Sequence, residues 1–196
     1  SDVAPTAATL NVKITGTGGF REEIAGTDPL VVDALRAHWR MDEGSGTKIT
    51  DEANGYVGTF NGGQPAKWVA GKFGQALEFT TGDNQVVLDP MSHPRPTGTA
   101  LSFSFWSWGA SNVKRNTSIL EATNGGNRIS NIHHPWSNGH VYWDQGNGGH
   151  DRINKNPPMN KLQGSWTHWV FTKNRSTGTM KAYYDGAEFM SGTGKT

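Results

Sequence analysis

The segment Leu101–Trp108 reads LSFSFWSW, and its pattern decides the fold class. Apolar side chains alternate with serine at its start, which is the period of a β-strand with one buried face. We expect Phe103 and Phe105 to face the core between two sheets. Trp106 and Trp108 would then lie on the opposite face of the strand, whereas the alternative orientation exchanges the two pairs.

Short segments with strand-like patterns recur along the chain, and Gly, Asn, Asp and Pro separate them. This spacing predicts an all-β fold, a two-sheet antiparallel jelly-roll sandwich. A short helix is expected only at Leu30–Arg36, where Asp28 can cap and Pro29 fits the first turn. The other expected strands are Thr9–Thr15, Phe20–Ala25, His38–Asp42, Tyr56–Phe60, Gly74–Thr80, Val86–Leu88, Thr117–Ala122, Arg128–His133, His140–Trp143, Trp166–Lys173, Thr179–Tyr184 and Ala187–Met190.

Composition excludes several classes of function. The chain has 196 residues, a formal net charge of +1 and no cysteine. The absence of cysteine removes disulfides, thiol catalysis and Cys-ligated metal, and the small net charge argues against nucleic acid as a partner. No apolar run approaches the roughly 18 residues that span a bilayer, so we expect no membrane insertion. Because Ser1–Leu10 lacks the pattern of a signal peptide, we expect a fragment or mature form of a longer protein.

Several motifs follow one another from about His38 onward. They are HWRMDEGSGTKITDEANG from His38, WVAGKFGQALEF from Trp68, VVL from Val86, LSFSFWSW from Leu101 and WTHWVFTKNRSTGTMKAYYDG from Trp166. In this order and spacing the chain resembles the laminin-G-like group of concanavalin A-like jelly rolls, of the bacterial type. The matching residues are Trp39, Asp42, Gly44, Ser45, Gly46, Gly71, Gly74, Ala76, Leu77, Phe79, Trp106, Trp166, His168, Tyr184, Asp185 and Gly186.

The resemblance implies a laminin-G-like domain over residues 36–196, with an N-terminal extension or the end of an upstream region over residues 1–35. The family usually continues beyond the hairpin at Asp185 with further strands, which this sequence does not contain. Since the first and last strands are neighbours in this fold, we expect an open sheet edge. Either Thr9–Thr15 or a second chain would cover that edge.

The stretch Asn131–Arg152, NIHHPWSNGHVYWDQGNGGHDR, has the composition of a wet binding surface. Sugars stack an apolar face on an aromatic ring and need planar polar partners for their hydroxyls. The alternative is structural, with Trp143 in the core and Trp136 filling a loop. Trp106 would line the concave groove that related jelly rolls use for glycans. The predicted carbohydrate-binding residues are His134, Trp136, Trp143, Asp144, Asn147, Arg152 and Trp106.

Asp83 and Asn84 form the candidate metal site. They lie between two predicted strands, and their oxygens could bind Ca²⁺, as in several related jelly rolls. The same residue types are common turn formers that need no ion, and the acidic loop Asp42–Asp51 is an alternative calcium site. Zinc is disfavoured because adjacent His133 and His134 would point to opposite faces of a strand.

No catalytic constellation can be assembled from the sequence. A retaining glycosidase needs two carboxylates about 5 Å apart, whereas the acidic pairs at 42–43 and 51–52 are adjacent and would face opposite ways. His140 and Tyr142 are residue types that a lyase uses, but their surroundings do not have the spacing of a lyase signature.

We therefore expect a non-catalytic carbohydrate-binding or adhesion module, lectin-like, within a larger exported protein. Its partner would be a glycan or another cell-surface polymer, and its location extracellular or in the cell envelope. One alternative is a protein–protein assembly module that self-associates, or binds another chain, through the open sheet edge. The other alternative is a polysaccharide-degrading enzyme.

Overall fold

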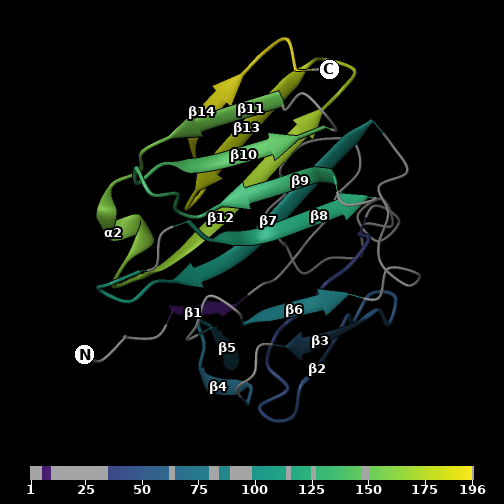
Figure 1. Ribbon diagram of the computed structural model, residues 1–196, viewed down its shortest axis with the longest axis vertical. Coiled ribbons are helices and arrows are strands. Elements are labelled where there is room, and N and C mark those ends of the chain that lie inside the picture. The colour runs from purple at the N-terminus through teal and green to yellow at the C-terminus, as the bar shows by residue number, and fades with distance from the viewer. Residues whose placement is uncertain are drawn as a thin grey trace.

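Antiparallel β-strands in two packed layers make up the protein, which is seen here as a computed structural model (Figure 1). Among the described residues, no helix is long and apolar enough to cross a membrane. The structure describes residues 6–9, 35–61, 65–79, 84–88, 99–113, 116–124, 127–146 and 151–195.

One layer is a seven-stranded sheet with the strand order β14-β13-β12-β7-β1-β5-β4. Its centre is β7, the strand predicted from LSFSFWSW, and β12 pairs with β7 along its whole length. The strands of this sheet are β1 (Thr6–Thr9), β4 (Lys67–Ala70), β5 (Gln75–Phe79), β7 (Ala100–Trp108), β12 (Trp166–Asn174), β13 (Thr179–Tyr184) and β14 (Ala187–Gly192).

The other layer consists of two smaller sheets. A four-stranded sheet, β11-β10-β9-β8, lies across β12, β13 and β14, and a three-stranded sheet, β2-β3-β6, lies toward the opposite end of the molecule (Figure 1). One helical turn, α2 (Met159–Leu162), precedes β12. The strands of this layer are β2 (Lys48–Thr50), β3 (Val57–Asn61), β6 (Gln85–Leu88), β8 (Ser118–Asn124), β9 (Asn127–His133), β10 (Val141–Gln145) and β11 (Asp151–Lys155).

The core lies between the layers and contains the predicted phenylalanines. Phe105 pairs with Trp169 across β7 and β12, and Phe103 pairs with Phe171, so all four side chains share one sheet face. The opposite layer contributes Trp143, whose ring lies edge-on to Phe103 at 5.5 Å. All five residues are buried. The predicted antiparallel sandwich, with Phe103 and Phe105 in its core, is confirmed.

Two turns next to core strands have a backbone geometry that favours the residues found there. Asp185 and Gly186 join β13 to β14 with positive φ at both residues, 48° and 81°, which is the pattern of a two-residue type I′ hairpin. Gly71 precedes β5, where a Cβ would meet the Gln75 carbonyl oxygen at 2.4 Å, so only glycine fits. These local features hold the core strands at their predicted positions.

The predicted strand His38–Asp42 is wrong, because the structure has only an isolated bridge there, between Trp39 and Asp51. The Asp51 carboxylate accepts a hydrogen bond from the His38 backbone N–H, and Met41 has a left-handed φ of 58°, which interrupts an extended strand. A side chain therefore takes the place of a ladder partner.

At the N-terminus, β1 spans Thr6–Thr9 and lies inside the sheet between β5 and β7, not at an outer edge. The remainder of the predicted strand Thr9–Thr15 lies outside the described residues, as do the strand Phe20–Ala25 and all but the last two residues of the helix Leu30–Arg36. Those two residues are not helical. The strands β2, β4 and β11 and the helix α2 were not expected from the sequence.

Candidate functional site

The outward face of the β8–β11 sheet carries most of the polar and aromatic side chains predicted to bind a ligand. In β10, Trp143 points inward, so its neighbours Tyr142 and Asp144 point outward. The strand register places Tyr142 between His133 and Asn154, and Asp144 between Asn131 and Arg152. The two rows lie next to each other on one surface.

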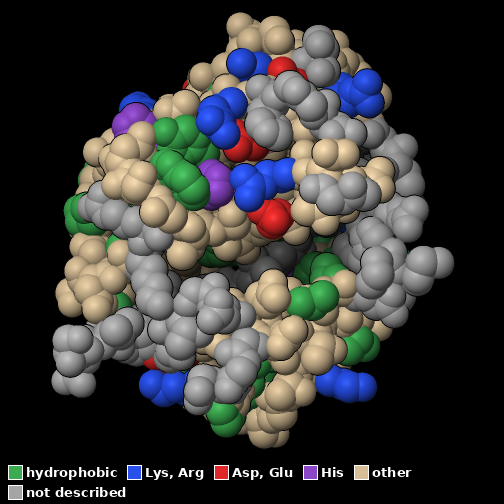
Figure 2. All heavy atoms as spheres, viewed as in Figure 1, with side chains coloured by type: hydrophobic (Ala, Val, Ile, Leu, Met, Phe, Trp, Pro, Cys, Tyr) green, Lys and Arg blue, Asp and Glu red, His purple; other side chains and the backbone are tan. Residues whose placement is uncertain are grey.

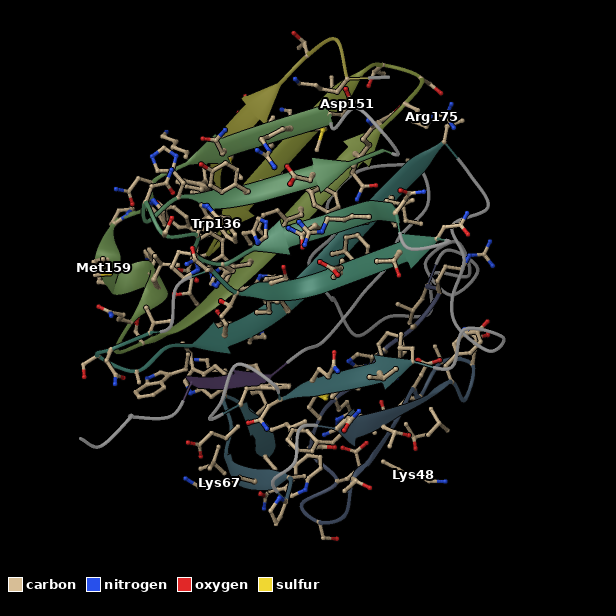
Figure 3. The ribbon with its side chains drawn as sticks, in the orientation of Figure 1. Lys48, Lys67, Trp136, Asp151, Met159 and Arg175 are labelled. Atoms are coloured by element: carbon tan, nitrogen blue, oxygen red, sulfur yellow. The ribbon has the colours of Figure 1, made fainter. Side chains whose placement is uncertain are left out.

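Trp136 extends this surface at the turn that joins β9 to β10 (Figure 3). The backbone N–H of Trp136 donates to the His140 carbonyl at 2.9 Å, and that of Gly139 donates to the Trp136 carbonyl at 2.9 Å. These hydrogen bonds hold the turn closed while the Trp136 side chain is 37% exposed. The turn therefore presents a large ring to solvent in a fixed position.

Four side chains form a continuous row of flat surfaces, which we call the aromatic strip: Trp136, His133, Tyr142 and Arg152. The His133 ring centre lies 4.3 Å from that of Trp136 and 6.1 Å from that of Tyr142. The guanidinium carbon of Arg152 lies 4.9 Å from the centre of the Tyr142 ring. Each contact is within the range of aromatic or cation–π attraction, so the strip is held together by its own members.

Arg152 is fixed by a bidentate ion pair with Asp144. Its Nε and Nη2 donate to the two carboxylate oxygens at 2.6 and 2.7 Å. Asp144 is buried, whereas the Arg152 side chain is 43% exposed. By accepting these hydrogen bonds, Asp144 raises the pKa of Arg152 above its usual value. The pair keeps the guanidinium plane against Tyr142, and it engages only Nε and Nη2 of the guanidinium.

A second ion pair borders His133 on the other side. Arg128 Nη2 lies 2.5 Å from a Glu121 carboxylate oxygen, and Arg128 Nη1 lies 3.5 Å from His133 Nε2. Burial lowers the pKa of His133, so its ring is neutral at pH 7. His133 Nδ1 lies 3.2 Å from the Ser118 hydroxyl and 3.4 Å from the Thr117 carbonyl. This geometry fits a ring that donates through Nδ1 and accepts from Arg128 through Nε2.

Side-chain amides complete the rim of the aromatic strip. The Asn138 amide donates to the Tyr142 hydroxyl at 2.7 Å, and His140 Nδ1 lies 2.9 Å from the Asn154 side-chain oxygen. Figure 2 shows His, Arg or Lys, and acidic side chains gathered beside hydrophobic ones on this face. Flat apolar surfaces bordered by planar hydrogen-bonding groups are what a sugar ring requires.

Two of the predicted ligand-binding residues belong to the core. Trp143 has no exposed surface, and His134 is buried between Phe105 and Trp169, at ring-centre distances of 5.8 and 4.6 Å. Burial lowers the pKa of His134 to about 4. Because neighbouring residues of an extended chain point to opposite faces, outward His133 and Tyr142 require inward His134 and Trp143. The structural alternative for Trp143 is the correct one.

Trp106 lies on the other layer, apart from the aromatic strip. Its ring centre is 5.1 Å from that of His168 and 5.8 Å from that of Phe73, and Lys72 Nζ lies 5.2 Å from it. Ser104 Oγ lies 2.7 Å from His168 Nε2 on the same face, and burial lowers the pKa of His168. The Trp106 ring is thus half-covered by neighbouring side chains of its own sheet.

The predicted metal and loop residues are described only in part. Asp83 and Asn147 lie outside the described residues, and Asn84 directly precedes β6. Within the part of the chain that the structure describes, no group of three or more His, Asp or Glu side chains could hold a metal ion. Calcium binding at Asp83 and Asn84 stays a prediction.

Several residues of the outward face were not predicted from the sequence. Arg128 and Glu121 lie on separate strands, and nothing in the sequence pairs them. Tyr142 could have been found, because two adjacent aromatic residues in a strand must face opposite ways. The sequence alone left open which of the two, Tyr142 or Trp143, points outward.

Comparison with known proteins finds a likeness, and it concerns the fold. No family model matches the chain, and no curated protein matches it. A solved structure shares the β-sandwich fold: domain 4 of AbnA, a GH43 extracellular arabinanase from Geobacillus stearothermophilus, in complex with arabinotriose. The two are 20% identical with a TM-score of 0.60, and the match covers 81% of this chain and 75% of that chain.

Proposed function

We propose that this domain is a non-catalytic carbohydrate-binding module that recognises a glycan through the aromatic strip. The observation that carries the proposal is the fixed row of Trp136, His133, Tyr142 and Arg152 on an outward sheet face. Trp136, Tyr142 and Arg152 are at least partly exposed and offer sugar rings stacking surfaces and hydrogen-bond donors together, while His133, which is only 6% exposed, packs between Trp136 and Tyr142. Stacking needs little rearrangement of the protein, because the strip is already ordered.

The state of the acidic side chains on this face favours binding over catalysis. A glycosidase needs two carboxyl groups, one of them available as a proton donor. Asp144 and Glu121 are instead each engaged by an arginine, and Asp144 is buried beneath its partner. Both carboxylates are therefore already occupied by ion pairs on this face, and they do not form the facing pair of carboxyl groups that hydrolysis requires.

The likeness to the arabinanase domain supports the proposal, since that domain was solved with arabinotriose bound. In this setting the module would belong to a larger exported protein and act outside the cell or in the cell envelope. The laminin-G-like grouping, and calcium binding by Asp83 and Asn84, are further parts of the proposal. The sequence motifs between His38 and Gly186 support the grouping, and the oxygen-bearing side chains of Asp83 and Asn84 support the calcium site.

Affinity electrophoresis in gels that contain a soluble polysaccharide tests the proposal. Wild-type protein should be retarded by at least one member of a panel that includes arabinan, xylan, galactan and polygalacturonate. Trp136→Ala should lose that retardation. The matched control is Phe73→Ala, which removes a 64%-exposed aromatic ring from the other sheet and should leave retardation unchanged. No retardation of the wild type, or loss through Phe73→Ala alone, would contradict the proposal.

A further inference from the structure

The charges on the binding face are balanced. Arg152 is paired with Asp144, and Arg128 is paired with Glu121, so each guanidinium already has a carboxylate partner. His133, between the two pairs, is neutral at pH 7 because burial lowers its pKa. An anionic ligand would therefore meet no unpaired cation among these residues, and it would approach two carboxylates.

The residue between the two ion pairs, Asn131, adds no accessible cation or donor to the face. The register places Asn131 between Asp144 and Glu121 on the outward side of β9. Asn131 is fully buried, and both its side-chain nitrogen and its side-chain oxygen lack a hydrogen-bond partner. Because protein covers both atoms, the Asn131 amide offers no accessible donor to an anionic group of a ligand.

We infer that the aromatic strip selects neutral glycans, whose sugar units carry hydroxyls but no carboxylate, sulfate or phosphate groups. This inference rests on the proposed function and names the ligand class of the same face. The exposed edge of each ion pair supplies donors from the arginine, and half-exposed Glu121 supplies an acceptor. Neighbouring hydroxyls of a neutral sugar use both, while a uronic acid would be repelled by the acceptors.

The inference is tested by removing the carboxylate partner of Arg128 while leaving the side chains of the aromatic strip unchanged. Glu121→Gln removes the carboxylate beside Arg128 and leaves its guanidinium unpaired. The matched control is Glu188→Gln, which removes the exposed partner of Lys181 on β13 and β14 and causes the same change in net charge. Isothermal titration calorimetry would measure the binding of neutral oligosaccharides and of oligogalacturonate by both variants and by the wild type. Thermal melting would establish that both variants are folded.

Wild-type protein should bind a neutral oligosaccharide more tightly than oligogalacturonate. Glu121→Gln should bind oligogalacturonate about fivefold more tightly than the wild type does at low salt, and added salt should remove the gain. Glu188→Gln should show no such gain. Tighter binding of oligogalacturonate by the wild type, no gain from Glu121→Gln, or an equal gain from Glu188→Gln would overturn the inference. If the wild type binds none of the oligosaccharides, the proposed function itself fails.

Discussion

His133 and His134 are adjacent in the chain but belong to different regions of the molecule. His133 lies on the outward face, 4.3 Å from the ring of exposed Trp136, and has polar partners at both ring nitrogens. His134 lies in the core against Phe105 and Trp169, and its Nε2 has no partner. The comparison teaches that strand parity, rather than residue type, separates the surface proposed to bind ligand from the surface that stabilises the fold.

Two tryptophans of the stretch Asn131–Arg152 are likewise divided between the core and the outward face. Trp143 is fully buried and packs on Phe103 and Phe171, whereas Trp136 keeps more than a third of its surface exposed. One ring contributes its hydrophobic area to folding, and the other leaves that area available to a ligand. Substitution of Trp143 should therefore mainly lower stability, whereas substitution of Trp136 should mainly weaken ligand binding.

The largest expected effect is on the core side of this comparison. Trp143→Ala should lower the free energy of unfolding by about 3–5 kcal/mol, because it leaves a large cavity between the layers. Trp136→Ala should lower it by only about 1 kcal/mol, since that ring packs on His133 at the surface and its removal leaves no cavity between the layers. Urea denaturation followed by circular dichroism measures both values. Equal destabilisation by the two variants would contradict the assignment of the faces.

The second prediction is that protonation of His134 lowers the free energy of unfolding at acid pH. Its pKa is lowered from 6.5 to about 4 in the folded protein, so the unfolded chain binds more protons in the window between these values. The free energy of unfolding should be fully retained above pH 6.5 and fall by about 3 kcal/mol as the pH drops toward 4.

His134→Phe should remove this contribution, because phenylalanine does not titrate. His134→Gln serves as a second variant if the larger ring does not pack. Denaturation curves at a series of pH values measure the slope for each protein. A slope between pH 6.5 and 4 that is the same in the wild type and in both variants would show that His134 is not the group responsible.

The smallest expected changes in stability come from breaking the two ion pairs of the outward face. Asp144→Asn should cost about 1–2 kcal/mol, because the buried carboxylate accepts two charge-assisted hydrogen bonds from Arg152. Glu121→Gln should cost less than about 0.5 kcal/mol, since both members of its pair are about 40% exposed. Thermal melts would show whether the order is as expected, and a larger loss from Glu121→Gln would reverse it.

Much of the fold could be predicted from the sequence, because its signals are local. Alternation in LSFSFWSW identified β7 and its core face, and the residues Asp185-Gly186 identified the β13–β14 hairpin. The signals failed where long-range contacts decide the structure. At His38 the Asp51 side chain replaces a ladder partner, and β11 has only Ile153 as an apolar residue, so its pattern was too weak to recognise.

The candidate site was predictable as a region but not as a set of residues. The stretch Asn131–Arg152 does supply the turn with Trp136 and the Asp144–Arg152 pair. The sequence did not determine which alternate residues of the strands point outward, because aromatic residues occupy both sets of positions, as Tyr142 and Trp143 show. The Glu121–Arg128 pair depends on the register of β8 against β9, which no local pattern encodes.

The most direct test of the account is a titration of the ¹⁵N-labelled protein with a neutral oligosaccharide that it binds, followed through the indole N–H signals of its eight tryptophans. Substitution of single tryptophans by phenylalanine would assign the signals. The account predicts that the Trp136 signal shifts with the ligand, while those of buried Trp143 and Trp169 stay in place. A shift of the Trp106 signal, on the opposite layer, with Trp136 unchanged would contradict it.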